Sequence, residues 1–555
     1  MHEYNLMEYG SNIFDFDDIW VGSHSRPYQN NRETIMSGNA VTNLRRMLGL
    51  AVASGVSMTS AAAIAATLNV GINMDATNLD PHRATATTDV ALAGWMFNGL
   101  VRFAPGSADP ASIEPDLATS WETSEDGLTW TFHLRDGVEF QRGYGPLTAN
   151  DVVYSLERAA DPERSSFAND YAAFESVEAL DPETVQIKLS APVPGFLGLV
   201  ANYHGGMVVS RKAAEEKGDA FNGDPVGTGP FEFQEAVTQQ HVDLVANPDY
   251  YRGAPELDGI RLQIIPSDSS RELALMSGEL DLIYGKREQR WVDQVSRNEN
   301  IIVDIFAPGE YRTLYLNETH APLDNINVRE AVAHAINVDE ISAFVGEDVG
   351  PRGCSAVPPG YLGESCDAGI FSHDPELAKS LLAEAGFPDG ITLTAVVSSS
   401  SSQKPIMEVI QAQLAQAGIK MEMNVVDHPT YHQQIRQDLS DLVFYGAARF
   451  PVADSYLSQF YHSQAIVGTP TAVTNFSHCK VADAQIDAAR VETNPETQMQ
   501  LWAEAQKLIH DDVCAVPLFS LMQVWARSEK LDYGYELTGN LNLAPSITEN
   551  TALAE

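Results

Sequence analysis

The chain has 555 residues, about four times the length of a typical single domain, so we expect more than one hydrophobic core. It contains 76 acidic and 34 basic residues, and its net charge of −42 would repel nucleic-acid phosphates and anionic membrane surfaces. Nucleic-acid binding is therefore not expected. The four cysteines include no CxxC pair, which argues against zinc ribbons and iron–sulfur clusters.

The N-terminal region has the residue order of a secretory signal peptide. An apolar run at 47–64 follows Arg45 and Arg46 and ends in small residues, with the expected cleavage site near Ala65. A transmembrane anchor is the alternative, but glycine, serine and threonine make the run weakly hydrophobic for a membrane span. We therefore expect a periplasmic protein without stable membrane insertion, in which 1–65 form an N-terminal extension and signal peptide.

Strand-like and helical segments alternate along the mature region, which predicts an α/β protein. The first strand is expected at 68–72. The alternating segment 128–134 predicts a half-buried strand, and the turn Asp136-Gly137 predicts that it pairs with the next apolar run in a hairpin.

Later segments predict helices with clear ends. One helix is expected at 376–385, after Asp374 and Pro375, and a second contains the apolar positions of 406–414. The segment 419–423 then returns to a strand pattern.

Five serines at 398–402 lie between an expected strand and the second of these helices. They form either a flexible loop whose last serine caps the helix or a connection whose hydroxyl and amide groups face a ligand. If the serine run faces a ligand, Ser398 and Ser399 are the candidate ligand-binding residues.

Catalytic and cofactor motifs are not found. The sequence contains no G-x-S-x-G, H-E-x-x-H, Walker A or EF-hand motif. We expect no pair of histidines four residues apart on a helix, no metal site, no cofactor and no catalytic residue.

Export would allow the four cysteines to form disulfides. Cys354 and Cys366 are close in sequence and are the more plausible pair, which leaves Cys479 and Cys514 for a second bridge. Four cysteines allow three pairings, and the sequence alone does not choose among them.

A series of segments runs in order along nearly the whole mature chain: LATSWE with LRDGVEF (117–140), TANDVV (148–153), PVGTGPF (225–231), NPDYYRG (247–253), SGELD (277–281), LN, PLD and VREA (316–331) and LAEAGFPDG (382–390). Together they resemble the periplasmic solute-binding proteins of the dipeptide, oligopeptide and nickel family, solute-binding protein family 5, which serve ABC importers. Each segment alone is weak evidence for the family, but the segments in this order are specific to it.

The resemblance implies a two-lobe periplasmic binding protein fold of the type II or cluster C kind, with an extra inserted subdomain and a ligand cleft between the lobes. Two chain crossings, near 306–309 and 516–519, would form a hinge. The implied segments are 1–65 (N-terminal extension and signal peptide), 66–108, 224–305 and 520–555 (lobe I), 109–223 (inserted subdomain) and 306–519 (lobe II).

The implied function is that of a receptor that captures a small solute and delivers it to ABC permease subunits by hinge closure, and we expect a monomer. Two alternatives stay open. One is a secreted hydrolase, for which the sequence shows no nucleophile and base pair. The other is a periplasmic chaperone or sensor that uses the same cleft.

The sequence departs from the peptide-binding members at the ligand site. Those members carry a Trp and, three residues later, an Asp that holds the peptide ammonium, ahead of a Phe-Leu pair. If Tyr456-Leu457 is that pair, an ungapped count places Gly446 at the Trp position and Arg449 at the Asp position. A guanidinium suits a carboxylate or phosphate rather than an ammonium group, so we expect an anionic compound or a modified peptide rather than a plain dipeptide.

Other ligand-binding candidates surround Arg449. Tyr445 and Phe450 would be aromatic walls, and Tyr311 and Thr85 are weaker candidates. The alternative for Arg449 is an ion pair with Asp454. Dipeptide binders also tend to carry an Arg before the helix that begins near Lys404, where this chain has the serine run.

Overall fold

The computed structural model describes residues 66–468 and 474–554. The expected signal peptide and its cleavage site near Ala65 lie outside the described residues. Within these two ranges, no helix combines the length and apolar character that a membrane span requires.

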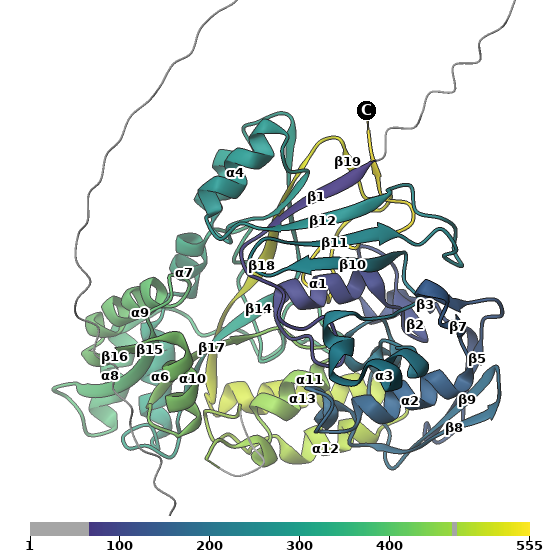
Figure 1. Ribbon diagram of the computed structural model, residues 1–555. Helices are drawn as coiled ribbons and strands as arrows, with labels where there is room; N and C mark the ends of the chain where they lie inside the picture. Colours follow the sequence, from purple (N-terminus) through teal and green to yellow (C-terminus); the bar gives the residue numbers. More distant parts are fainter. Residues whose placement is uncertain (1–65, 469–473, 555) are drawn as a thin grey trace, which may run out of the picture. The chain divides into compact units, whose positions relative to one another are not determined.

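The largest element is an eight-stranded mixed sheet in the order β10-β11-β12-β1-β13-β18-β14-β17 (Figure 1). Its core strands β1 and β12 are parallel, and β1 is the strand predicted at 68–72. The strands are β1 (Thr67–Ile72), β10 (Phe231–Val237), β11 (His241–Ala246), β12 (Gly259–Ile264), β13 (Leu282–Tyr284), β14 (Ile301–Leu316), β17 (Leu442–Ala447) and β18 (Ala515–Ser528).

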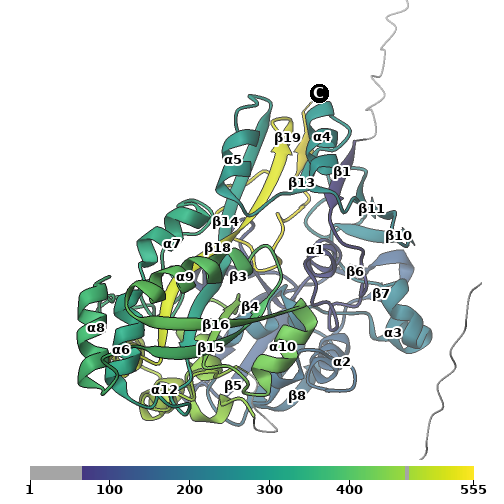
Figure 2. The ribbon, with the colours of Figure 1, turned by 90° about the vertical axis from the view of Figure 1, so that its left-hand side faces the viewer.

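Strands β14 and β18 are long, antiparallel and paired through both lobes (Figure 2). We call the part around β1 and β10–β13 lobe I, and the part around β17 lobe II. In lobe I the ladder joins 301–306 to 523–528, and in lobe II it joins 310–315 to 515–521, with a break in register between the two. The crossing expected at 306–309 coincides with this break, whereas the one expected at 516–519 lies within the paired part of β18. The division into segments stays a prediction.

Lobe I also contains short strands and three helices. The C-terminal chain returns to it, since the Trp95 indole of α1 donates a hydrogen bond to the carbonyl of Pro545. These elements are α1 (Thr87–Met96), β2 (Val101–Phe103), β3 (Ile113–Pro115), α4 (Asp268–Ser277), α5 (Gln289–Val295), β19 (Leu531–Asp532) and β20 (Ala552–Leu553).

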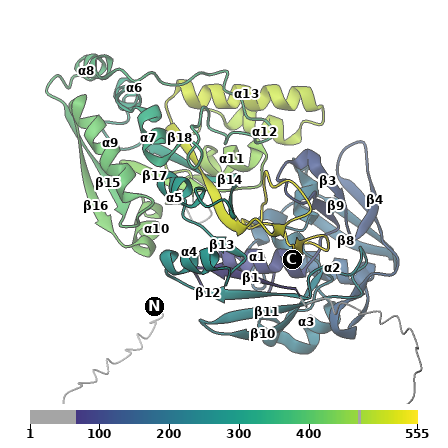
Figure 3. The ribbon, with the colours of Figure 1, turned by 90° about the horizontal axis from the view of Figure 1, so that it is seen from above.

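We call the region between β3 and β10 the inserted part. It contains a four-stranded antiparallel sheet, the inserted sheet, in the order β4-β5-β9-β8. In Figure 3 this sheet lies on the opposite side of the view from β15 and β16 of lobe II. The elements of this part are β4 (Ala118–Thr123), β5 (Thr129–Leu134), β6 (Glu139–Phe140), β7 (Gly145–Pro146), α2 (Ala149–Ala159), β8 (Phe174–Asp181), β9 (Thr184–Leu189) and α3 (Arg211–Lys217).

The strand β5 is the one predicted at 128–134, but the predicted hairpin is wrong. Its partners are β4 and β9, whereas β6, which follows the turn, pairs with β7. The alternating pattern specified a strand. Its partners depend on distant segments that bury the same face, such as Val185 and Ile187 of β9.

In the described residues, lobe II combines a parallel pair of strands with eight α-helices (Figure 1). They are α6 (Ile326–Ala335), α7 (Val338–Val345), α8 (Pro375–Glu384), β15 (Ile391–Ser398), α9 (Lys404–Gln416), β16 (Ile419–Val426), α10 (His428–Arg436), α11 (Ala453–Phe460), α12 (Asp483–Val491) and α13 (Pro495–Asp511).

The predicted ends of α8 are confirmed, and their causes are local. The Asp374 carboxylate accepts a hydrogen bond from the Leu377 amide at 2.9 Å, and Pro375 occupies the first helical position. Gly386, with φ of 93°, then takes the left-handed conformation that ends the helix. The helix α9 and the strand β16 are confirmed in the same way, since both form where the patterns predicted them.

Three clusters of buried apolar side chains confirm that the chain has more than one core. The first lies in lobe I and the inserted sheet, and the third lies among α11, α12 and α13. The second joins α4 and α5 to α6, α8 and α9 by way of β14 and β18. The two lobes therefore share apolar packing along the strands that connect them.

Both expected cysteine pairs form disulfides, Cys354 with Cys366 and Cys479 with Cys514. The second pair is fully buried and joins the start of β18 to the chain before α12. It closes the longer loop, with 35 residues of separation against 12 for the first pair.

Replacing Cys479 and Cys514 together by alanine should lower the free energy of unfolding by about 3–4 kcal/mol, because the bridge limits the entropy of the unfolded chain. Replacing Cys354 and Cys366 should cost about 1 kcal/mol less, since their loop is shorter. Urea denaturation of the two variants measures the difference. An equal or larger loss for the shorter loop would contradict this expectation.

Candidate functional site

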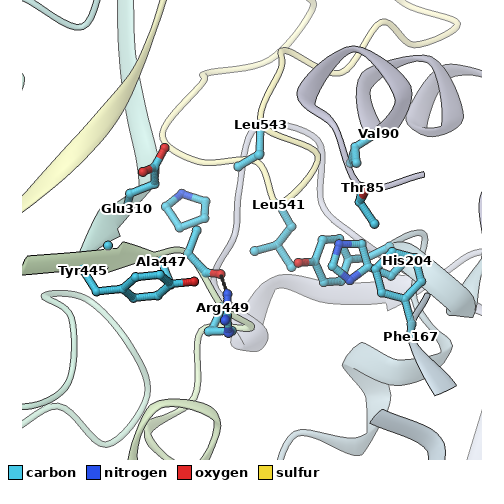
Figure 4. A pocket seen from close by; sticks show the side chains of 14 residues that line it. Thr85, Val90, Phe167, His204, Glu310, Tyr445, Ala447, Arg449, Leu541 and Leu543 are labelled. Atoms are coloured by element: carbon cyan, nitrogen blue, oxygen red, sulfur yellow. Dashed lines mark hydrogen bonds between the residues drawn. The ribbon is translucent and has the colours of Figure 1, made fainter. Parts of the chain in front are cut away.

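A cavity of about 340 Å³ lies between the two lobes (Figure 4). Lobe II contributes the end of β17 and the middle of β14, while lobe I and the inserted part contribute the opposite wall. The lining residues are Thr85, Val90, Phe167, Tyr203, His204, Pro308, Glu310, Tyr445, Gly446, Ala447, Ala448, Arg449, Leu541 and Leu543.

On the lobe II side, Arg449 is held by neutral groups. Its Nε donates to Gln459 Oε1 at 2.6 Å, and its Nη1 donates to the Ala448 carbonyl at 2.9 Å. The guanidinium carbon lies 5.5 Å from the centre of the Phe460 ring. No carboxylate in 66–468 or 474–554 forms an ion pair with it.

The alternative ion pair between Arg449 and Asp454 does not form. Asp454 instead pairs with Arg490 of α12, with Nε 3.4 Å from Oδ1. Arg449 thus forms no ion pair with a carboxylate of the described residues. Asp170 is the carboxylate that feels its charge: burial raises the pKa of Asp170, and Arg449 partly offsets this rise.

On the opposite wall, the His204 imidazole stacks between two aromatic rings. The ring centres lie 3.6 Å from Tyr203 and 4.0 Å from Phe167. Burial between these rings, and then the charge of Arg449, lower the pKa of His204, so the imidazole is neutral near pH 7. The imidazole of His204 can therefore form hydrogen bonds in the cavity without adding a charge to it.

A buried network holds the turn that carries Thr85. Arg158 of α2 forms an ion pair with Asp80, in which Nη1 donates to Oδ1 at 2.8 Å. The same Nη1 lies 2.8 Å from His82 Nδ1, and His82 Nε2 lies 2.9 Å from the Met207 carbonyl. Because arginine only donates, His82 Nδ1 accepts and Nε2 carries the proton. The network connects the Thr85 turn to the segment that follows His204.

A second cavity of about 220 Å³ adjoins the first. The two share Glu310, Tyr445 and Gly446 as lining residues. The other residues that line the second cavity are Arg287, Arg312, Ser400, Ser402, Gln403, His428 and His432.

Glu310 lies between two arginines in this second cavity. Its carboxylate oxygens lie 2.7 Å from Arg287 Nη1 and 2.6 Å from Arg312 Nη2. Burial raises the pKa of Glu310, but the two guanidinium groups outweigh burial and hold it below its usual range. The carboxylate is therefore ionised at neutral pH, and the group of three carries one net positive charge.

The expectation that no two histidines lie four apart on a helix is wrong. His428 and His432 do so on α10, with their Nε2 atoms 3.1 Å apart. Burial and then His428 lower the pKa of His432 to about 4, so this imidazole is neutral near pH 7. The spacing H-x-x-x-H at 428–432 is visible in the sequence.

The structure brings together three of the seven candidate ligand residues. Thr85, Tyr445 and Arg449 line the first cavity, while Tyr311 is buried and donates from its hydroxyl to the Ser355 carbonyl at 2.6 Å. Phe450 packs on the inserted part, where its ring closely approaches Gly198.

Ser398 and Ser399 line neither cavity. Ser398 is buried against His428, with 3.0 Å from its Oγ to Nδ1. Ser400 and Ser402 line the second cavity instead, and α9 begins after Gln403 without a side-chain cap. The prediction that the last serine of the run caps the helix is therefore wrong, because no serine side chain caps α9.

Sequence reasoning missed Glu310 and Arg312, which line the second cavity. They are two residues apart on β14 and so share one face of the strand. Charged residues at this spacing inside a long apolar strand were the available signal.

The family model described as bacterial extracellular solute-binding proteins, family 5 Middle, matches residues 112–467. The chain belongs to this family. It is 30% identical over 457 residues to heme-binding protein A of Haemophilus influenzae, covering 76% of this chain and 81% of that protein.

Two solved structures are similar over almost their whole length. MoaA from A. tumefaciens R10, in complex with mannopinic acid, is 48% identical with a TM-score of 0.79, covering 89% of this chain and all of that one. DppA from Helicobacter pylori, in complex with the peptide STSA, is 30% identical with a TM-score of 0.73, covering 88% of this chain and 98% of that one.

Family membership establishes the class of function. The protein is an extracytoplasmic solute-binding receptor of an ABC importer, with the two-lobe α/β fold of that family. The family consists of receptors that bind small molecules or peptides and deliver them to permeases rather than of enzymes.

The His82 network should make stability depend on pH. Burial and then Arg158 lower the pKa of His82 to about 4, whereas an unfolded chain protonates histidine near about pH 6.5. The stabilisation is therefore complete above about pH 6.5 and is lost as the pH falls toward 4. Between pH 7 and pH 5, the wild-type protein should lose about 2 kcal/mol more stability than His82→Gln.

Urea denaturation at the two pH values measures this difference. His133→Gln is the control, because the side chain of His133 is 43% exposed on β5. The control should keep the wild-type pH dependence. If His82→Gln also keeps the wild-type pH dependence of stability, the claim that His82 is neutral in the folded protein is refuted.

Proposed function

We propose that the solute is a small anionic compound whose carboxylate is anchored by Arg449 in the cavity between the lobes. The observation that carries the proposal is the guanidinium of Arg449, which lines the cavity and has no carboxylate partner in the described residues. A guanidinium can form two parallel hydrogen bonds with a carboxylate, and burial strengthens such a pair.

The charge at this position disfavours a plain peptide. Glu310 is the one acidic residue that lines the first cavity in the described chain, and two arginines already neutralise it. A peptide ammonium group would therefore meet Arg449 with no unpaired carboxylate among the described residues that line the first cavity. Repulsion between like charges would oppose its binding.

The rest of the cavity suits a compound with hydroxyl groups. The imidazole of His204 and the hydroxyl groups of Thr85 and Tyr445 can bind polar atoms, while Leu541 and Leu543 form an apolar side. The volume lies within the range of small-molecule sites, roughly 300–1,000 Å³.

The similarity to the mannopinic acid complex supports this choice of ligand class. That structure is 48% identical over 89% of this chain, against 30% for the peptide complex. We therefore infer a sugar-acid or opine-like ligand, for which mannopinic acid is the first probe.

Delivery would follow closure of the lobes on the solute. The interruption of the β14–β18 ladder between Phe306 and Glu310 supports a hinge there, because fewer ladder hydrogen bonds resist bending. A solute that contacts both lobes would shift the population toward the closed form. We further propose a monomer, cleaved near Ala65, that presents the closed form to the permease.

Arg449→Gln should lower the affinity for mannopinic acid at least tenfold, which is about 1.4 kcal/mol. Isothermal titration calorimetry of the 66–555 protein measures the change. Arg297→Gln, which removes an exposed arginine of lobe I, is the matched control and should bind as the wild type.

A loss of less than tenfold for Arg449→Gln would refute the anchor. Binding of ordinary dipeptides with equal affinity would refute the anionic class while leaving the receptor function intact. Nuclear magnetic resonance of the released solute tests the hydrolase alternative, since a receptor returns it chemically unchanged.

A further inference from the structure

We propose that the second cavity is a subsite for a second oxyanion of the same solute, so that the ligand is an elongated dianion spanning both cavities. The inference rests on the proposed role of Arg449 in the first cavity. It adds Arg312 as the second anchor and thereby specifies the charge and the length of the ligand.

Arg312 has hydrogen-bonding capacity that the described chain does not use. The residue is 4% exposed, and its Nη2 donates to Glu310 at 2.6 Å. Its Nε is buried without a partner among the described residues. An unpaired buried donor is unfavourable, so a ligand oxygen that accepts a hydrogen bond from it would be stabilised.

Gly446 provides the space that the guanidinium occupies. A Cβ atom on Gly446 would lie 2.4 Å from Arg312 Cδ, 2.6 Å from Nε and 2.8 Å from Cζ. The backbone of Gly446 does not have positive φ, so the conformation itself does not require glycine. The absence of a side chain at Gly446 therefore leaves the space that Arg312 occupies where it lines the second cavity.

Charge and polarity in the second cavity favour an oxyanion. Arg287 and Arg312 carry two positive charges against the single negative charge of Glu310. The hydroxyl-bearing residues Ser400 and Ser402 line the same space. His432 adds a neutral imidazole whose Nδ1 is buried without a partner in the described part of the chain.

One solute can reach both anchors. Arg312 lies opposite Gly446 in the β14–β17 ladder, and Arg449 follows Gly446 by three residues. Three residues of extended chain span at most about 10 Å. The two cavities also share Glu310, Tyr445 and Gly446, so no wall of other residues separates them.

Calorimetry of the wild-type 66–555 protein gives the first test. The probes are mannopinic acid and its two monoamides, each of which has one carboxylate replaced by an amide. Mannopinic acid should bind at least tenfold more tightly than either monoamide. If either monoamide binds as tightly as the diacid, the second oxyanion subsite is refuted without any variant. A phosphate ester in place of the second carboxylate tests whether phosphate serves as well.

Variants assign each carboxylate to its anchor. Arg312→Gln should abolish the preference for the diacid over one monoamide, and Arg449→Gln should abolish the preference over the other. If both variants lose the preference for the diacid over the same monoamide, a single carboxylate binds both arginines, and the proposal is overturned. An effect of Arg449→Gln alone refutes only the second subsite, and an effect of Arg312→Gln alone refutes the proposed anchor at Arg449.

Two further variants separate ligand binding from neutralisation of Glu310. Gly446→Ala keeps Arg312 but displaces its guanidinium, so it should weaken diacid binding at least tenfold even if Arg312→Gln folds poorly. Glu310→Gln removes the competing carboxylate and should tighten diacid binding. If Arg312 only neutralises Glu310, the double variant Glu310→Gln/Arg312→Gln will bind the diacid as the wild type does, and the inference fails. Arg297→Gln again serves as the control.

Discussion

The pairing of β14 with β18 is the constraint on which the rest of the structure depends. These two strands carry one antiparallel ladder from lobe I into lobe II and join their apolar cores. Where the ladder is interrupted, β14 presents Pro308 and Glu310 to the cavity between the lobes. The same strands therefore connect the lobes and line the cavity in which we propose that the solute binds.

Unequal distribution of charge around β14 and β17 determines what the cavities can bind. The chain as a whole carries a net charge of −42, yet Arg287, Arg312 and Arg449 face the two cavities against the single carboxylate of Glu310. An anionic solute of the class we propose would be repelled by most of the surface and stabilised at these two cavities. This contrast favours specific binding over adsorption elsewhere on the protein.

The opposite wall is made rigid by buried polar contacts. The Asp80–Arg158 ion pair and His82 connect the turn of Thr85 to the carbonyl of Met207, next to the segment of His204. Breaking such a pair leaves a buried charge without compensation, which is strongly unfavourable. These buried contacts therefore hold together the wall of the cavity that lies opposite Arg449.

The sequence by itself determined the family, the α/β class and the helices α8 and α9, because these follow from local patterns and ordered motifs. It favoured one of the three possible cysteine pairings and suggested Arg449 as a candidate, and the structure decided the pairing and placed Arg449 at the cavity. Only the tertiary structure decided the partners of β5, the burial of Tyr311 and the approach of Arg312 to Gly446. These features depend on which distant segments pack together, such as β14 beside β17, and no local pattern specifies that contact.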